Sequence, residues 1–369
     1  MSAWSVKTEI YRCKNDSIKS ISITIRNQKL EAPIIQVDKG SISDAQIGCD
    51  RKSLQESRRR QSAGATVSDS KGKVDCEGTE NDWRQHQGGN KMKWNIVTDS
   101  SCDLLSTSKM NGEMQISSVP FTISVGNQDF VDSEELDIHL MLDAMEQAEC
   151  ASHTSCPSPN EWLEQFEKAD YTIAITISSQ LSGSMNSAMA AKEMAVELYP
   201  EKKIAVLDSR STGPELVLCV EEIEKQIQKG SEFEDVVSYA EKFLKKTKVM
   251  FALSSFDNLI KNGRMSKITG FIAKKLGMWG IGIGSEEGKI VMESKVRGTK
   301  KAVEELIANM KKKGFCGNKV AISHCDNPML AQTLKKRIRE VWKNAEVEIL
   351  PMRGLCSYYA ERGGLIVSY

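Results

Sequence analysis

From residue 92 onward, short apolar runs alternate with longer segments in which apolar residues recur at helical spacing. The runs KWNIVTDS, YTIAITIS and KKIAVLDS predict strands. The segments between them predict helices, including SEELDIHLMLDAMEQA with Ser133 as its N-cap and GPELVLCVEEIEKQIQKG with Gly230 at its C-terminal end. Strands and helices that alternate in this way predict an α/β domain over residues 92–248, with a mainly parallel sheet flanked by helices.

The pattern becomes less regular beyond residue 249. VMFALSS predicts a strand, and MWGIGIGSEEGKIVMESKVRG predicts a hairpin with SEEG as its turn. Two further helix-and-strand pairs follow, and GGLIVSY predicts a last strand. Because hairpins and helices are mixed here, we expect residues 249–369 to form a second, α+β domain with a largely antiparallel sheet.

Residues 1–91 differ from the rest of the chain. The segment 19–37 predicts one or two short strands, whereas residues 41–91 are rich in serine, glycine and charged residues and have few aliphatic clusters. Such a composition buries too little apolar surface to offset the entropy of ordering. We therefore expect residues 1–91 to be a disordered or mis-called extension, with Met92 as a plausible natural start.

Charge and composition exclude several classes of protein. Lysine plus arginine and aspartate plus glutamate both number 50, which argues against a nucleic-acid binder. No apolar run is long enough to span a membrane, and the N-terminus lacks the pattern of a secretory signal. The ten cysteines contain no CxxC pair and the four histidines are isolated, so we expect no metal site. These features predict a cytoplasmic protein without stable membrane insertion.

Three loops that follow predicted strands carry small polar residues, at positions 98–104, 177–184 and 207–213. In an open α/β sheet, ligands bind outside the carboxyl ends of the strands. We therefore expect the three loops to face one crevice, with Asp99 and Ser100 contributed by the first of them.

The loop at 177–184 leads directly into a predicted helix. Ser182 and Gly183 stand where the N–H groups of the first helical turn have no intrahelical partner, and Gly183 lets a ligand approach the backbone closely. This arrangement predicts an anion site without a formal cation. The alternative is that Ser182 or Ser184 only caps its own helix, and the loop by itself does not separate the two.

A second group of hydroxyl residues precedes the helix at 159–169. Ser158 or Asn160 can cap that helix, which leaves Thr154 and Ser155 available for binding. Further along, Arg264 precedes an amphipathic segment at 265–280. That segment is either a core helix or one wall of an apolar tunnel with Arg264 near its mouth.

Templates for catalysis match poorly. The chain has no GxSxG elbow and no GxGxxG after its first α/β strand. Asp99 could serve as the nucleophile of a phosphotransferase or hydrolase, although Ser101 stands where haloacid-dehalogenase enzymes have their second aspartate. The sequence therefore favours binding over turnover, with the Asp99 enzyme as the alternative.

The motifs TDSS, VPF, TSCPSP, SSQLSGSMNSA, VLDSRSTG, LIKNGRMSK and KVRGTKKA follow one another in this order. Taken together they resemble the DegV family over about residues 92–369. The family consists of bacterial proteins of two α/β domains that bind a long-chain fatty acid, including the binding subunits of fatty acid kinase. The resemblance implies a non-catalytic carrier without a cofactor. It would present the fatty-acid carboxylate to a separate ATP-dependent kinase, for lipid transport or phospholipid synthesis.

The resemblance also implies roles for single residues. Thr154 and Ser182 would hold the carboxylate, with the Gly183 N–H as a further donor, and Arg264 would lie near the entrance. The chain departs from the family pattern at Cys156, where a glutamine is usual, and at Tyr359, which stands about where many members have a histidine. Other possible pocket or entrance residues are Ser155, Tyr359, Asp99 and Ser100.

Overall fold

The computed structural model divides the chain into two compact units, Met1–Asn81 and Asp82–Tyr369. It describes the backbone of three strands in the first unit and residues 92–104, 114–148, 152–265 and 277–369 of the second. The first unit holds an antiparallel sheet in the order β1-β2-β3. Its strands are β1 (Val6–Arg12), β2 (Ile18–Ile25) and β3 (Gln28–Ala32).

Sequence analysis predicted strands in the region of β2 and β3 but not β1. That residues 1–91 are a disordered or mis-called extension remains a prediction, and residues 41–91 lie outside the described residues, as does most of the amphipathic segment after Arg264.

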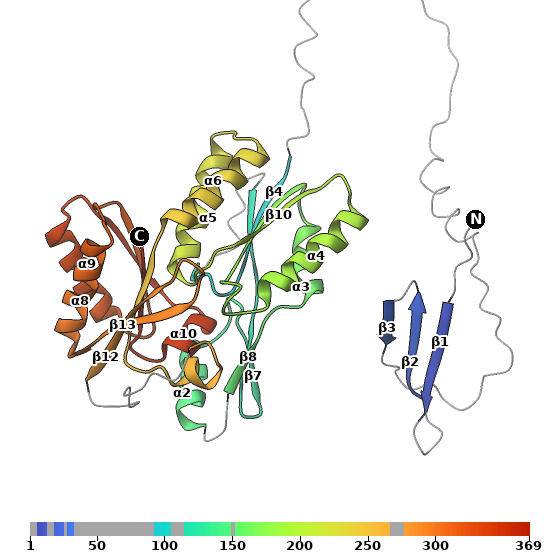
Figure 1. Cartoon of the computed structure of the whole chain (residues 1–369), viewed down its shortest axis with the longest axis horizontal. Coiled ribbons are helices and arrows are strands. Elements are labelled where there is room, and N and C mark those ends of the chain that lie inside the picture. The colour runs from blue at the N-terminus through green and yellow to red at the C-terminus, as the bar shows by residue number, and fades with distance from the viewer. Residues whose placement is uncertain are drawn as a thin grey trace, which may run out of the picture. The chain divides into compact units, whose positions relative to one another are not determined.

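A four-stranded parallel sheet in the order β10-β9-β4-β5 forms the first layer of the second unit. Both of its faces are buried, because α5 and α6 cover one and α3 and α4 cover the other (Figure 1). This burial explains why its strands are continuous apolar runs. The strands are β4 (Trp94–Asp99), β5 (Met114–Val119), β9 (Tyr171–Thr176) and β10 (Lys203–Asp208), and the helices are α3 (Pro159–Phe166), α4 (Ser184–Leu198), α5 (Pro214–Gln228) and α6 (Phe233–Lys246).

The second large sheet has six strands in the order β13-β12-β11-β16-β14-β15, and every neighbouring pair except β14 with β15 is antiparallel. Helices α8 and α9 cover one face. The predicted fold class, with a mainly parallel sheet followed by a largely antiparallel one, is confirmed. The elements are β11 (Val249–Leu253), β12 (Met278–Gly284), β13 (Ile290–Arg297), α8 (Thr299–Lys312), β14 (Lys319–His324), α9 (Pro328–Val341), β15 (Glu346–Pro351) and β16 (Leu365–Ser368).

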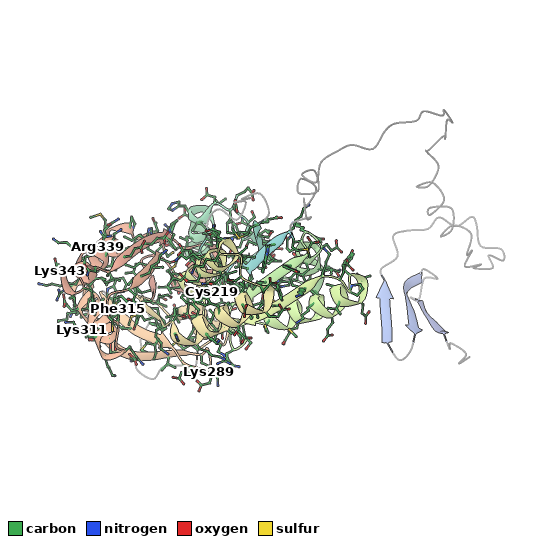
Figure 2. All side chains as sticks on the ribbon, turned by 90° about the horizontal axis from the view of Figure 1, so that it is seen from above. Cys219, Lys289, Lys311, Phe315, Arg339 and Lys343 are labelled. Atoms are coloured by element: carbon green, nitrogen blue, oxygen red, sulfur yellow. The ribbon has the colours of Figure 1, made fainter. Side chains whose placement is uncertain are left out.

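Lys311 of α8, Arg339 of α9 and Lys343, which follows α9, are exposed near the buried ring of Phe315 (Figure 2). Phe315 packs edge-on against Trp342 with 4.9 Å between ring centroids. The apolar residues of α8 and α9 pack against the sheet in one core, as the helical spacing of these residues predicts.

A third, antiparallel sheet in the order β7-β6-β8 was not predicted as a separate layer. It packs with α2, α7 and α10 against β11, so Ile123 and Met141 share one apolar core with Phe251 and Tyr358. The division of the chain at residue 249 remains a prediction. The elements of this region are β6 (Thr122–Val125), β7 (Gln128–Val131), α2 (Ile138–Gln147), β8 (Ser152–Ser155), α7 (Asp257–Lys261) and α10 (Gly354–Ala360).

The N-cap predicted for α2 was wrong. The helix begins at Ile138, and its N-cap is Asp137, whose carboxylate accepts a hydrogen bond from Leu140 N at 3.0 Å. The Ser133 hydroxyl accepts instead from Glu135 N at 3.3 Å in the preceding turn. Serine and aspartate are both favourable N-cap residues, and the turn after β7 places Asp137, not Ser133, at the start of the helix.

One buried charged pair joins α10 to the rest of the unit. Arg353 and Asp132 are 3% and 1% exposed, with 3.8 Å between Arg353 Nε and Asp132 Oδ1. The Arg353 guanidinium also donates to the Ser118 hydroxyl at 2.8 Å and to the Asp132 carbonyl. The Asp132 carboxylate accepts from Gly354 N and Leu355 N, both at 2.8 Å. These bonds hold the first turn of α10 beside the end of β7.

We predict that Asp132→Ala destabilises the protein by about 3–5 kcal/mol, because it leaves the Arg353 charge buried without a partner. Urea unfolding followed by tryptophan fluorescence would measure the change. Glu304→Ala is the matched control, since the Glu304–Arg337 pair lies on the surface and should contribute little. Equal effects of the two substitutions would contradict the role given to Asp132.

Candidate functional site

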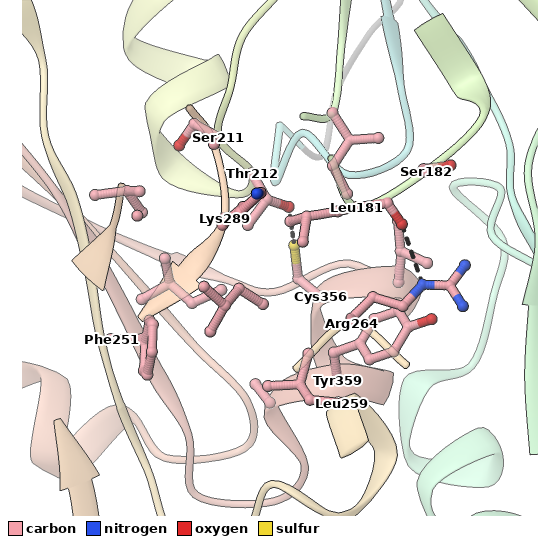
Figure 3. Close-up of a pocket in the computed structure, with 18 of the residues that line it drawn as sticks. Leu181, Ser182, Ser211, Thr212, Phe251, Leu259, Arg264, Lys289, Cys356 and Tyr359 are labelled. Atoms are coloured by element: carbon pink, nitrogen blue, oxygen red, sulfur yellow. Dashed lines mark hydrogen bonds between the residues drawn. The ribbon is translucent and has the colours of Figure 1, made fainter. Parts of the chain in front are cut away.

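A mostly apolar cavity lies between the loops at the carboxyl ends of β9 and β10 and the face of the second large sheet that α8 and α9 leave uncovered. Its empty volume, with the opening to solvent included, is about 840 Å³. β11, α7, α10 and the β12–β13 hairpin supply the other walls (Figure 3). The apolar lining residues are Phe121, Ile177, Leu181, Val249, Phe251, Leu253, Leu259, Ile290, Leu355, Ala360 and Ile366.

Four residues that the sequence singled out line this cavity together: Thr154, Ser182, Arg264 and Tyr359. Ser182, Arg264 and Tyr359 gather at one end, away from Phe251 (Figure 3). The Thr154 hydroxyl lies 2.9 Å from the Tyr359 hydroxyl. Burial raises the pKa of Tyr359, so its phenol stays protonated at neutral pH and can donate a hydrogen bond. This end of the cavity therefore offers three hydroxyl groups and one cation.

Arg264 is held in place by backbone carbonyls. Its Nε donates to Leu181 O at 3.1 Å and its Nη1 to Asn262 O at 2.5 Å. These bonds join the loop before α4 to the loop after α7, and they leave the other guanidinium N–H groups for a ligand or solvent. Among the described residues that line the cavity, the charged ones are Arg210, Arg264 and Lys289, all positive. The lining therefore favours an anionic ligand.

Ser182 lines the cavity, and its hydroxyl accepts a hydrogen bond from Ser184 N at 3.2 Å. The N-cap of α4 is Gly183, and no side chain of the described residues caps this helix, so the alternative that Ser182 or Ser184 only caps the helix is not supported. The first main-chain bond of the helix runs from Ser187 N to Gly183 O at 3.1 Å. The N–H groups of Met185 and Asn186 thus lie in the first turn, where the helix itself supplies no acceptor.

Gly183 is exposed and does not itself line the cavity. Its φ of −75° is an ordinary value, and a Cβ added there would meet only Cys156 Sγ, at 3.6 Å. The backbone conformation therefore does not require glycine at this position. Cys156 takes part in the small apolar cluster beside Leu181 and Tyr359.

β8 explains which hydroxyl group of the 152–155 segment faces inward. Side chains alternate along a strand, so Ser152 and Thr154 are half-buried while His153 and Ser155 are exposed. The Ser152 hydroxyl lies 2.8 Å from the hydroxyl of Tyr358, next to the Thr154–Tyr359 pair. Ser155 is thus not brought into the cavity.

Asp99 and Ser100 lie outside the cavity, fully buried at the end of β4. Asp99 Oδ1 accepts from the N–H and the hydroxyl of Ser101, while Oδ2 accepts from Ile177 N and the Ser184 hydroxyl. Because each carboxylate oxygen accepts two hydrogen bonds from the protein, neither oxygen is oriented toward a substrate. The carboxylate instead ties the end of β4 to the loop before α4. The Ser100 hydroxyl likewise accepts from Phe121 N at 2.9 Å.

Several lining residues were not identified from the sequence. Leu355, Cys356 and Ala360 come from α10, a helix too short to show a clear period. Thr212 was not named individually, although it belongs to the 207–213 loop that was predicted to face the crevice, and its hydroxyl lies 3.5 Å from Cys356 Sγ. Gly288 and Lys289 belong to the predicted SEEG turn and its flank, and the Ser178 hydroxyl donates to Gly288 O at 2.7 Å. The long-range pairing of the hairpin with the loop after β9 is what brings them to the cavity.

Within the described part of the chain, no group of three or more histidine, cysteine, aspartate or glutamate side chains is arranged to hold a metal ion. The same residues include no helix that is both long and apolar enough to cross a membrane.

A buried carboxylate lies behind the cavity wall. Asp103 Oδ1 accepts from Arg353 N at 2.9 Å, while Oδ2 has no hydrogen-bond partner among the described residues. Burial raises the pKa of Asp103 to about 7. In the unfolded chain this group loses its proton near pH 4. Its contribution to stability is therefore complete below about pH 4 and is lost as the pH rises toward 7.

We predict that Asp103→Asn removes this pH dependence while keeping an acceptor for Arg353 N. The free energy of unfolding of the wild type, relative to the variant, should fall as the pH rises from about 4 to 7. Urea unfolding at several pH values would measure it. Parallel pH profiles of the two proteins would show that folding does not change the pKa of Asp103.

The second unit is therefore a mixed α/β fold, in which two large sheets and one small sheet contribute to a single mostly apolar cavity. The chain belongs to the DegV family, whose model matches residues 93–369. A DegV domain-containing protein of Streptococcus pyogenes serotype M1 is 40% identical over 278 residues, which cover 75% of this chain and 99% of that protein. Another from Streptococcus pneumoniae R6 is 41% identical over 280 residues, with the same coverage.

Solved structures of similar proteins contain fatty acids. The Streptococcus pneumoniae fatty acid kinase B3 protein, loaded with linoleic acid, has a TM-score of 0.73 at 41% identity and covers 75% of this chain and 99% of its own. A DegV family protein of Eubacterium eligens loaded with heptadecanoic acid has a TM-score of 0.71 at 38% identity and covers 74% of this chain and 98% of its own. The resemblance to the DegV family found in the sequence is confirmed.

Proposed function

We propose that this protein binds one long-chain fatty acid in the cavity, with the carboxylate at the end formed by Thr154, Ser182, Arg264 and Tyr359. The observation that carries the proposal is a mostly apolar cavity in which the hydroxyl groups of Thr154, Ser182 and Tyr359 gather beside Arg264, away from Phe251. A second polar group of Ser211, Thr212 and Lys289 lies elsewhere in the lining (Figure 3). The fatty acids in the related pneumococcal and Eubacterium structures support it.

The free energy of binding such a ligand can be supplied by the apolar and hydroxyl groups of the lining. Burying a methylene contributes about 0.8 kcal/mol, so a sixteen-carbon tail offers roughly 12 kcal/mol before other terms. The lost freedom of the ligand offsets much of that gain. A carboxylate that leaves water must find hydrogen bonds, and the three hydroxyl groups beside Arg264 can supply them.

Tyr359 stands where the family often has a histidine, and this exchange changes the chemistry at the carboxylate. A tyrosine with a raised pKa donates a hydrogen bond but does not bring a positive charge at neutral pH. We infer that Arg264 supplies the positive charge near the carboxylate in this protein. The Gly183 N–H would be a further donor if the ligand reaches the start of α4.

The protein would act in the cytoplasm as a carrier without catalytic activity of its own. It would present the carboxylate to a separate ATP-dependent kinase, and the related fatty acid kinase B3 protein supports this assignment. The alternative enzyme that uses Asp99 gains no support from the geometry, because four hydrogen bonds occupy the carboxylate away from the cavity.

The direct test is to purify the protein from a bacterial host, denature it, extract it with organic solvent and identify the extract by mass spectrometry. A fatty acid in a one-to-one ratio is the expected result. A clean extract, together with no uptake of added palmitate or oleate, would refute the proposal.

Ser182→Ala is expected to weaken fatty-acid binding by about 1–3 kcal/mol, because the buried carboxylate loses a hydrogen-bond donor. Isothermal titration with oleate would measure the change. Ser155→Ala is the matched control, since Ser155 points to solvent from β8. Because the Ser182 hydroxyl also accepts a hydrogen bond from Ser184 N at the start of α4, the melting temperature of each variant shows whether a loss of affinity reflects unfolding.

Arg264→Ala is expected to lower the rate of phosphorylation by a kinase subunit about tenfold or more, because a preorganised charge near the reacting carboxylate is lost. Oleate affinity should fall less, since the tail supplies most of the binding energy. Lys289→Ala tests another cation of the cavity lining, exposed on the β12–β13 hairpin, and should spare phosphorylation. An equal loss of affinity and rate in Arg264→Ala would contradict this division of roles.

A further inference from the structure

The glycines of β12 all lie on one face of the strand. Trp279 and Ile281 pack into the core beneath α8, with Ile283 packed against it. Because successive side chains point to opposite faces, Gly280, Gly282 and Gly284 lie on the other face. In the sequence MWGIGIG, the large residues Trp279, Ile281 and Ile283 therefore face the core, and the glycines between them face the side of the cavity.

Side chains of the neighbouring strand β11 fill the space above the glycine face of β12. Phe251 pairs with Gly282 and Leu253 with Gly280, and residues directly opposite one another project to the same face. Val249, Phe251 and Leu253 all line the cavity, as does Gly284 itself. The side chains of β11 can therefore lie across β12 instead of standing upright into the cavity.

The available space shows how tightly this arrangement depends on glycine. A Cβ added at Gly282 would lie 2.2 Å from Phe251 Cζ and 2.4 Å from Val291 O. A Cβ at Gly284 would lie 2.6 Å from Val249 Cγ1, with no other atom within 4 Å. A side chain at either position must push its β11 neighbour aside, and at Gly284 only a side chain has to move.

We infer that the glycine face of β12 determines how long an acyl tail the cavity accepts, with Gly284 and Val249 as the specificity-determining pair. This inference rests on the proposed function. The polar residues at the other end direct the carboxylate toward Ser182 and Arg264, so the tail extends toward β11 and β12 (Figure 3). A residue larger than glycine at position 284 would shorten the space for the tail without touching the carboxylate end.

The test is a comparison of dissociation constants for saturated fatty acids of twelve to twenty carbons. Gly284→Ala should lower the affinity for the eighteen-carbon acid relative to the fourteen-carbon acid by about 4- to 16-fold, the equivalent of one or two methylenes. Val249→Leu should shift the profile in the same direction from the other strand. It also keeps the test valid if Gly284→Ala fails to fold.

Two further variants separate a change of shape from a change of stability. The double variant Gly284→Ala/Val249→Ala should return the profile toward that of the wild type, since the added methyl takes the place of the removed ones. Ile283→Val trims the core face of the same strand and should leave the profile unchanged.

The outcomes distinguish this inference from the proposed function. If the wild type binds fatty acids but Gly284→Ala and Val249→Leu keep its chain-length profile, the inference is overturned and the function stands. If the wild type binds no acid of the series, the proposed function itself fails.

Discussion

The buried ion pair of Arg353 and Asp132 is the interaction on which the cavity depends. It holds α10, which supplies Leu355, Cys356 and Tyr359 to the lining, beside the end of β7. A buried charge pair is favourable only when its remaining polar atoms are bonded, and here the hydroxyl of Ser118 and the first N–H groups of α10 complete the set. Gly354 permits this approach, because a Cβ there would lie 2.7 Å from Asp132 Oδ1.

Two further buried carboxylates near the cavity, those of Asp99 and Glu215, also join neighbouring segments. Asp99 ties β4 to the start of α4, and Glu215 accepts hydrogen bonds from Ser211 and Thr247. Their oxygens are turned toward backbone N–H groups and hydroxyl groups of neighbouring loops. The described lining consequently carries arginine and lysine but no carboxylate, which suits an anionic ligand.

Most of the architecture could be predicted from the sequence, because long apolar runs and amphipathic segments report burial directly. Both large sheets and their covering helices follow from these patterns. The short elements β7, β8 and α10 were missed, since four to seven residues are too few to show a period and their burial comes from distant partners. Within β8, only its pairing with β6 decides that Thr154 points inward and Ser155 outward.

The sequence by itself determined the fold class, the family and the residue types of the polar end, since these are carried by local patterns and motif order. Only the tertiary structure decided that Asp99 and Ser100 are buried supports while Thr154, Ser182, Arg264 and Tyr359 line one cavity. It also showed that the glycines of the GIGIG run leave room for the side chains of β11 to pack across β12. These outcomes depend on contacts between segments far apart in the chain, which local periodicity does not encode.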